Sequence, residues 1–474
     1  MPVARRDFTC AAALAAAGLA RAQPASFEAA DLRAAQQLAD AALRDTHAAR
    51  LLTELCTQIG ARPAGSAADA KAAAWAQASM KGLGLTRVRA EPLALRVWQR
   101  GAASARVLTP EVLPLTMAAL GNSVATPAEG ITAEVAWYDS LAELQADTRE
   151  PGRSRAHGRI VFINQKTDRT RDGRGYGAAV PARAFGPVEA ARRGALALGI
   201  RSIGTDREQI AHTGALRYEI GVPRIPAFAV SVPDAEAMAA WHAQGRPLRL
   251  ELKLEAKSDV EATTHNVIGE VPGTDLAHET VLISAHLDSW DLGQGAVDDG
   301  AGVAIVTAAA ACIARLAPRP RRTVRVVLFG NEENGFDGAR AYGDRYGQDP
   351  HQWVGESDFG AGRVWRLRSR VRTEALPLVR QMAQALAPLG VAWTDDADAN
   401  QGSPGPDAGV LMRRHGWPAV ELSQDGTAYF DVHHTVHDTL DRVDLTTLPQ
   451  NVACWAVTAW LAAQAPVGFG PLPK

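Results

Sequence analysis

Apolar residues follow a helical spacing in the first part of the chain. Between residues 27 and 85, leucines and alanines recur largely at steps of three and four, which is the period of an amphipathic helix. A Gly- and Pro-containing segment at residues 60–66 breaks this pattern, and a further helix is predicted over residues 69–81. Residues 88–97 alternate between apolar and polar side chains, and this alternation predicts a strand.

After residue 255, short apolar runs alternate with longer runs of helical spacing. The apolar runs predict buried strands at residues 264–269, 279–285, 323–329, 353–358 and 419–422. The longer runs predict helices at residues 300–316, 336–346, 376–389 and 445–463. Buried strands that alternate with helices indicate an α/β fold, in which a mostly parallel, mixed sheet is covered by helices on both faces.

The region between residues 109 and 255 has strands and helices of its own. Its strand candidates are residues 130–137, 159–164, 225–232 and 248–253, and its helix candidates are residues 186–198 and 233–244. The charged, Gly-rich residues 167–177 fit a solvated loop better than a substrate-facing patch. A block of this size between two structured regions predicts an inserted domain at residues 109–255, within a larger domain formed by residues 23–108 and 256–474.

The N-terminal residues have the pattern of an export signal. Arg5 and Arg6 precede an Ala- and Leu-rich segment at residues 10–20, and a small-x-small sequence ends at Ala22. This pattern predicts a twin-arginine-like signal peptide at residues 1–22, with cleavage near Ala22 and a periplasmic or secreted mature protein. An uncleaved N-terminal anchor is the alternative, although the apolar segment is too short to span a bilayer.

Composition and charge narrow the classes of partner. The chain has 474 residues, of which 47% are apolar and 22% charged, as in soluble globular proteins. Its net charge of -2 gives no electrostatic basis for binding nucleic acid or an anionic membrane. Beyond the leader, no apolar stretch reaches the length of about 18 residues that a membrane span needs. Cys312 and Cys454 lie in apolar helical runs and are predicted to be buried thiols rather than a disulfide.

Histidine and acidic side chains collect where one predicted strand ends. The apolar residues 281–285 are followed by His286 and Asp288, and a Gly-rich loop then leads to Asp298 and Asp299. Open α/β sheets carry their binding and catalytic groups at the carboxyl ends of their strands. A histidine and several carboxylates in that position predict half of a two-metal hydrolytic site.

Three later segments are candidates for the other half of this site. Glu332 and Glu333 follow one predicted strand, and Asp358 follows another. Taken singly, paired glutamates also suit a helix N-terminus, and an aspartate also suits a turn or a cap. Three of the chain's 12 histidines lie close together before the last predicted helix, and this clustering favours a ligand role. They are His433, His434 and His437.

Together, these motifs resemble those of the co-catalytic zinc exopeptidases of the bacterial leucyl aminopeptidase and carboxypeptidase Q type. The matching motifs are HLDSWDLGQGAVDDGAG, NEENG, GESD and HHTVHDT. The protease-associated domain of that family, a β-rich α/β domain, corresponds to about residues 110–255, where PVEAARRGALALGIRSIGT and HTGALRYEIGVPRIPA are also similar. The resemblance covers nearly the whole predicted mature chain.

The resemblance implies a site with two Zn²⁺ ions, for which Co²⁺ or Mn²⁺ could substitute. One ion would be held by His286, Asp298 and Asp358. The other would be held by Asp298, Glu333 and His434, so that Asp298 bridges the two ions. This set of two imidazoles and three carboxylates, without cysteine, suits zinc.

The resemblance also implies roles for residues around the metals. Glu332 would be the general base and later the general acid, and Asp288 would orient His286 through its free ring nitrogen. Asp438 would act similarly near His434. Asp299 would shape the turn into the following helix, joined to the residue before it by a cis peptide bond.

The expected function is an exported metallo-exopeptidase that acts on short peptides. Carboxypeptidase Q-like proteins act on dipeptides with free ends, which makes dipeptidase or carboxypeptidase activity the first expectation and aminopeptidase activity the alternative. Tyr429, His437 and arginines of the inserted domain are candidates for binding the substrate termini. A non-catalytic receptor ectodomain would have lost metal ligands, and a glutaminyl cyclase would use a single zinc and lack the inserted domain. Relatives with this domain are often homodimers.

Overall fold

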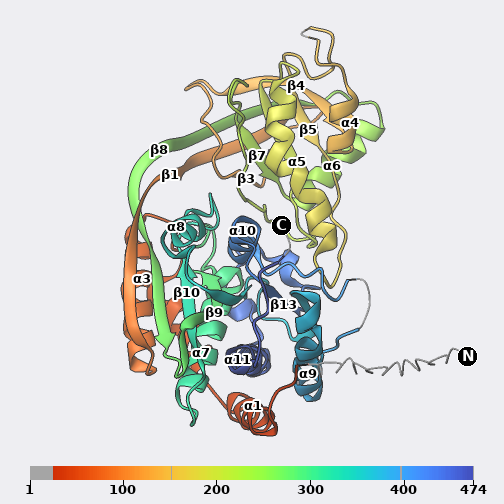
Figure 1. The fold of residues 1–474 in the computed structure, drawn as a ribbon. Helices are drawn as coiled ribbons and strands as arrows, with labels where there is room; N and C mark the ends of the chain where they lie inside the picture. The colour runs from red at the N-terminus through yellow and green to blue at the C-terminus, as the bar shows by residue number, and fades with distance from the viewer. Residues whose placement is uncertain (1–24, 151, 395–397, 473–474) are drawn as a thin grey trace, which may run out of the picture.

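The computed structural model describes residues 25–472, apart from residue 151 and residues 395–397. The predicted signal peptide at residues 1–22 lies outside the described residues. Two parts of the molecule are stacked on each other and joined by a long two-stranded ribbon, which rises along one side of Figure 1. The ribbon consists of β1 (Thr86–Thr109) and β8 (Arg249–Val271), which pair antiparallel along nearly their whole length.

The larger part is built on a mixed sheet with the strand order β12-β13-β11-β9-β10-β8. β9 pairs in parallel with β10 and β11, and β11 pairs in parallel with β13. β12 and β8 join antiparallel at the two sides. The prediction of a mostly parallel, mixed sheet is confirmed. The bounds are β9 (Leu276–His286), β10 (Arg322–Phe329), β11 (His351–Glu356), β12 (Val364–Arg370) and β13 (Ala419–Gln424).

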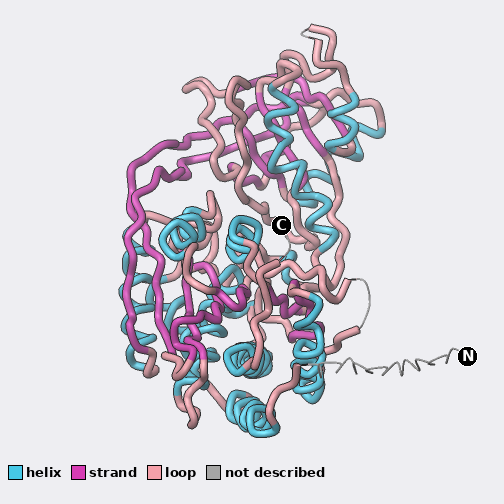
Figure 2. The backbone as a smooth tube through the Cα atoms, viewed as in Figure 1, coloured by secondary structure: helices cyan, strands magenta, loops and turns pink. Residues whose placement is uncertain are grey.

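Helices cover both faces of this sheet, as predicted (Figure 2). Val281 and Ile283 of β9 pack in one apolar cluster with α7 and α11, whereas Leu282 points to the opposite face and packs with α8 and α10. Helices α1, α2 and α9 form an outer layer on α7 and α11. The bounds are α1 (Ala29–Ala42), α2 (His47–Glu54), α3 (Ala67–Gly82), α7 (Ala301–Ala314), α8 (Asp337–Tyr346), α9 (Leu376–Leu386), α10 (Pro406–His415) and α11 (Leu448–Gln464).

The smaller part, residues 109–255, is called the insert below. Its sheet has the strand order β4-β5-β6-β7-β3, and β4 also pairs with β8, so a single sheet continues through the ribbon from one part to the other. The predicted domain boundaries lie on the ribbon, whose upper half packs in an apolar cluster of the insert. The bounds are β2 (Leu113–Leu115), β3 (Met117–Ala119), β4 (Ile131–Tyr138), α4 (Leu141–Ala146), β5 (Ile160–Ile163), α5 (Arg174–Ala191), β6 (Ala197–Arg201), β7 (Ala227–Val230) and α6 (Val232–Ala243).

The prediction of a helix over residues 186–198 is wrong. α5 ends at Ala191, and the chain from Ala197 forms β6, whose residues are all buried. A short apolar run that is buried on both faces has no period that would separate a strand from a helix. The loop predicted at residues 167–177 is also shorter than expected, because α5 begins at Arg174.

Other differences have similar physical causes. The predictions lack β12, in which arginines interrupt the apolar positions, and α10, which follows directly on the turn-forming sequence SPGP. The strand candidates at residues 248–253 and 264–269 are two ends of β8, which has 23 residues. The middle of β8 is exposed and polar because the ribbon runs outside the apolar core there.

One apolar helical segment and three cysteines belong to the core. The helical segment Ala296–Ala314 is the one among the described residues that is long and apolar enough to cross a membrane, and it is entirely buried within the protein. Cys56, Cys312 and Cys454 are buried and free, which confirms the prediction of buried thiols for the last two.

Candidate active site

Three neighbouring parallel strands bring the candidate residues to one edge of the sheet. β9 lies between β10 and β11 and ends at His286. Glu332 and Glu333 follow the end of β10, and Asp358 follows the end of β11. Because the carboxyl ends of parallel strands meet at the same edge, these side chains lie close together in space.

The structure brings together all five side chains that the resemblance implies as metal ligands. His286 Nε2 lies 3.1 Å from Asp298 Oδ1 and 3.5 Å from Asp358 Oδ1. His434 Nε2 lies 3.0 Å from Asp298 Oδ2 and 3.2 Å from Glu333 Oε2. Each oxygen of Asp298 therefore faces a different histidine, which is the arrangement that a bridging carboxylate needs.

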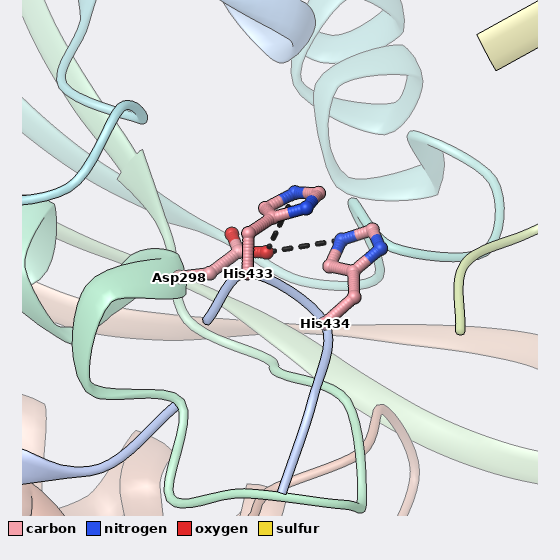
Figure 3. A group of neighbouring side chains, drawn as sticks. All are labelled: Asp298, His433 and His434. Atoms are coloured by element: carbon pink, nitrogen blue, oxygen red, sulfur yellow. Dashed lines mark ion pairs between the residues drawn. The ribbon is translucent and has the colours of Figure 1, made fainter. Parts of the chain in front are cut away.

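His433 lies in the same cluster, although the resemblance assigns the ligand role to His434 and none to His433. Its Nε2 is 3.3 Å from Asp298 Oδ2, and its ring stacks on the ring of His434 with 3.5 Å between centroids. Figure 3 shows both imidazoles reaching Asp298 from one loop. Burial lowers the pKa of both histidines, so the neutral rings offer nitrogen lone pairs to a cation.

Asp299 connects the end of β9 to the start of α7. One of its oxygens accepts the N–H of His286 at 3.1 Å, and the other accepts the N–H of Gly302 at 3.0 Å. The peptide bond between Asp298 and Asp299 is cis. A Cβ atom at Gly302 would lie 1.8 Å from the carbonyl oxygen of Ser357, so only glycine allows the helix to begin this close to β11.

Asp288 supports the glutamate pair rather than the histidine that precedes it. Its carboxylate accepts the main-chain N–H groups of Glu332 at 3.1 Å and of Glu333 at 3.4 Å. His286 Nδ1 lies 3.0 Å from the main-chain carbonyl of Asp288 but 3.8 Å from its carboxylate. The histidine ring is therefore oriented by the backbone, which differs from the expected carboxylate contact.

Asp438 also acts at a different place from the one expected. Its Oδ1 accepts the N–H groups of Ala296 and Val297, each at 2.7 Å. These residues directly precede Asp298, so Asp438 anchors the segment that carries this carboxylate rather than His434.

Arg62 is a supporting residue that sequence reasoning missed. Its guanidinium is fully buried and donates to the carbonyl oxygens of Leu287 at 2.6 Å, Gln294 at 2.8 Å and Gly295 at 3.0 Å. It thereby fixes the Gly-rich loop after β9. A lone arginine within a helix break gives no signal in the sequence that could predict this role.

The charges in the cluster suit a cation. Burial raises the pKa of Glu333 well above its usual value, and the charges of Asp298, Asp288 and Asp358 raise it further. Within the described residues, Asp298 Oδ2 and Glu333 Oε1 are buried and accept no hydrogen bond. Imidazole nitrogens and carboxylate oxygens are ligands of zinc, and a divalent cation would offset the repulsion among the acids. The residues present therefore fit a metal site.

A cavity of about 520 Å³ opens onto the cluster and extends to the ribbon and the insert. Glu332 and Glu333 line one end, while Trp98 and Tyr218 contribute aromatic surface. Apart from those glutamates, the charged residues of its lining are four arginines and a single acid. They are Arg96, Arg217, Arg224, Arg340 and Asp259.

The fold and the buried cluster together define a metal-dependent hydrolase of the α/β class. Comparison with known proteins identifies it as a metallopeptidase. The family model described as Peptidase family M28 matches residues 266–459. Carboxypeptidase Q of Bos taurus is 36% identical over 418 residues, which make up 87% of this chain and 84% of that protein. The chain belongs to peptidase family M28.

Solved structures agree with this assignment. A peptidase M28 precursor from Shewanella amazonensis SB2B is 44% identical and superposes with a TM-score of 0.89, over 94% of this chain and 99% of that chain. A zinc aminopeptidase from Bacillus subtilis superposes with a TM-score of 0.57 at 19% identity, over 87% of this chain and 93% of that chain. At that identity the second similarity concerns the fold alone.

Proposed function

We propose that this protein is an exported two-zinc exopeptidase that hydrolyses dipeptides and other short peptides with a free carboxyl terminus. The observation that carries the proposal is the position of Asp298, whose two oxygens face His286 and His434 separately. A single-metal site would need only one of these arrangements.

Two groups of three side chains would hold the ions. His286, Asp298 and Asp358 would bind one, and Asp298, Glu333 and His434 would bind the other. Bound zinc would supply Lewis-acid activation of both the attacking water and the peptide carbonyl. The five ligands carry three negative charges, so the site would keep a net positive charge that attracts the substrate carbonyl.

Glu332 is suited to move the proton of the attacking water. It lines the cavity, and among the described residues it belongs to none of the groups of side chains that lie close enough together to hold a metal ion. Its N–H is held by Asp288, which fixes where the side chain starts. Its enclosed position raises the pKa of its carboxyl group well above the usual value, in the direction that a base acting near neutral pH requires. Glu332 would take a proton from the attacking water and pass it to the leaving amine.

The arginine-rich cavity favours recognition of a carboxylate over recognition of an amine. Arg217 is exposed and has no hydrogen bond or ion pair from its side chain to the rest of the described protein. A guanidinium of this kind can bind a carboxylate in a bidentate manner. The substrate ammonium of an aminopeptidase would need an acid, and Asp259 already lies 3.9 Å from Arg224. Aminopeptidase activity is therefore the second candidate.

A dipeptide panel with free, N-blocked and C-amidated ends, assayed with and without chelator, tests this proposal. We expect chelator-sensitive hydrolysis that requires the free carboxylate. Arg217→Ala should lower kcat/KM for free dipeptides about 10- to 100-fold, as loss of a charge-assisted hydrogen bond does, and leave C-amidated dipeptides unchanged. Arg207→Ala is the matched control, because Arg207 is an exposed insert arginine outside the cavity lining. Rapid cleavage of C-amidated but not N-blocked dipeptides would instead identify an aminopeptidase.

Export is tested separately. We propose that residues 1–22 are a twin-arginine signal peptide that is cleaved near Ala22. Intact-mass measurement of the protein purified from the periplasm or medium should give a chain that starts just after this residue. Retention of the full-length chain in the cytoplasm of an Arg5→Lys, Arg6→Lys variant, but not of the unaltered protein, would identify the export route.

A further inference from the structure

We infer that the insert is a working part of the metal centre, because Asp206, His212 and Thr213 position the loop that carries His434. This loop, residues 429–438, is called the ligand loop below. The inference rests on the two-metal site proposed above. The positioning residues are distant from the ligand loop in the sequence. The contacts of His212 with His433 and of Thr213 with His434 each span 221 residues.

The ligand loop has little secondary structure of its own to fix its conformation. Tyr429–Asp431 form a short 3-10 turn, and the chain then bends without joining a strand. His434 has a φ angle of +62°, in the left-handed region that non-glycine residues rarely adopt. A ligand held in this conformation needs support from outside the loop.

The insert supplies that support directly at the ligand residue. The N–H of Thr213 donates to the carbonyl oxygen of His434 at 3.0 Å. In return, the carbonyl oxygen of Thr213 lies 3.3 Å from Nδ1 of the same histidine. A proton on Nδ1 that faces this carbonyl leaves the lone pair of Nε2 for a cation between Asp298 and Glu333. The contact therefore selects both the ring orientation and the tautomer of His434.

A buried pair in the insert holds the next residue of the loop. His212 Nδ1 lies 2.8 Å from the carbonyl oxygen of His433, and His212 Nε2 lies 2.6 Å from Asp206 Oδ2. Both ring nitrogens thus face oxygen acceptors, and Asp206 keeps the ring from rotating. Gly204 packs directly against this ring, because a Cβ atom at Gly204 would lie 2.1 Å from His212 Nε2.

Further contacts tie the start of the ligand loop to the insert. The N–H of Thr205 donates to the carbonyl of Phe430 at 3.0 Å, and the ring of Tyr176 stacks on the ring of Phe430 with 4.3 Å between centroids. Arg169 contacts both carboxylate oxygens of Asp431, at 2.9 and 2.6 Å. Ordinary packing between two parts of a protein could account for these contacts, but it does not require hydrogen bonds to the main chain and ring of a metal ligand.

The consequence is a difference between the two ions. The ion held by Asp298, Glu333 and His434 depends on the insert, whereas the ion held by His286, Asp298 and Asp358 does not. Loss of the His212 contact should lower the affinity for the first ion about 10- to 100-fold, which is the usual effect of removing a group that orients a metal ligand. The second ion should bind as before.

The experiment uses the full mature chain, with zinc and cobalt as probes. His212→Phe keeps a ring but removes both ring nitrogens, while His212→Asn returns a donor near the position of Nδ1. His242→Ala is the matched control, because His242 is an exposed insert histidine whose ring stacks on Trp137. Chelator competition measures the affinity of each ion, and the visible spectrum of bound Co²⁺ reports the geometry of each site.

We expect His212→Phe to lower the affinity for one ion and to alter the Co²⁺ spectrum. His212→Asn should recover most of that affinity, and His242→Ala should match the unaltered protein. The inference would be overturned if His212→Phe bound both ions as tightly as the unaltered protein does. It would also be overturned if the variant bound both ions more weakly by the same factor. Asp206→Asn, which leaves the packing unchanged, carries the same test if His212→Phe does not fold. An unaltered protein that binds fewer than two zinc ions would contradict the proposed function itself, which is a separate outcome.

Discussion

The two sides of the proposed metal site are held in different ways. His286, Glu333 and Asp358 stand on or just beyond strands of one parallel sheet, and the ladder between β9, β10 and β11 sets their spacing. We call these residues, with Asp298, the strand side. His434, on the ligand loop, has no such ladder and depends on hydrogen bonds from the insert. If these residues bind metal as proposed, one site combines ligands fixed locally with a ligand fixed by distant residues.

The largest expected effect lies on the strand side and separates proton transfer from metal binding. Glu332→Gln should keep both zinc ions and lose kcat by about 10²- to 10⁴-fold, because the amide cannot accept the proton. Metal analysis and steady-state kinetics on the same sample check both statements. Glu333→Gln is the control, since it should lose metal as well as activity. Near-normal turnover by a metal-loaded Glu332→Gln protein would remove the assignment of the base.

Ligand substitutions should then distinguish the two sides. His434→Ala is expected to lose one zinc and retain the other, and Asp358→Ala should do the same for the opposite ion. Zinc content measured by elemental analysis after exhaustive dialysis reads out both variants. If His434→Ala kept two zinc ions per chain, His433 would be the more plausible ligand, since it also lies 3.3 Å from Asp298.

Metal removal should increase the mobility of the ligand loop more than that of the strand side. Zinc at about 1,000 times its Kd would stabilise the folded chain by about 4 kcal/mol, and chelation removes this contribution. Hydrogen exchange should then rise more in residues 429–438 than in residues 281–286, which remain in the strand ladder. Comparable increases in both segments would show that the two sides are equally dependent on metal.

A smaller effect is expected from the support of the glutamate pair. Asp288→Asn leaves an acceptor for the N–H of Glu332 but removes the negative charge, so activity should fall about 10- to 100-fold with both metals retained. The measurement is kcat at a fixed, saturating zinc concentration. A loss of zinc from this variant would mean that Asp288 also positions a metal ligand, either His286 or Glu333, whose N–H it accepts.

The last effect concerns the stability of the scaffold at the start of α3 rather than activity or metal content. Burial raises the pKa of Asp69, at the start of α3, to about 6. The unfolded chain releases this proton near pH 4 while the folded chain keeps it, so the stability should fall as pH rises from about 4 to about 6. The predicted loss is about 3 kcal/mol for a shift of about two pKa units. Denaturation of Asp69→Asn and of the unaltered, metal-free protein at several pH values should show a steeper loss of stability in the latter, because the other buried acids, such as Glu332 and Glu333, titrate in both proteins.

The closeness of the five ligand side chains could be predicted from sequence because most of them follow recognisable apolar strands. Parallel strands end at a common edge, so the order along the chain translates directly into neighbours in space. The same reasoning identified the α/β fold. It failed for β6 and α10, where buried or Pro-containing segments carry no distinctive period.

The supporting contacts could not be predicted in the same way. Asp288 and Asp438 stand in the expected motifs but hold backbone groups of Glu332 and Ala296 instead of the histidines. Arg62 lies in a helix break, and His212 opens the segment HTGALRYEIGVPRIPA, whose similarity to the family assigned no role to the histidine. Their roles arise from hydrogen bonds to distant main-chain groups, and such bonds leave no pattern of spacing in the sequence.

The order of these segments along the chain has a consequence for folding. The ligand loop lies near the C-terminus, and its contacts with Thr213 close a separation of 221 residues. Contacts over such distances form slowly, because the entropy of closing a long loop must be overcome first. During synthesis, the residues of the insert are complete before residues 429–438 exist, whereas α11, which covers one face of the sheet, follows them. A chain that ends before residue 434 would therefore carry four of the five proposed ligands and no finished site.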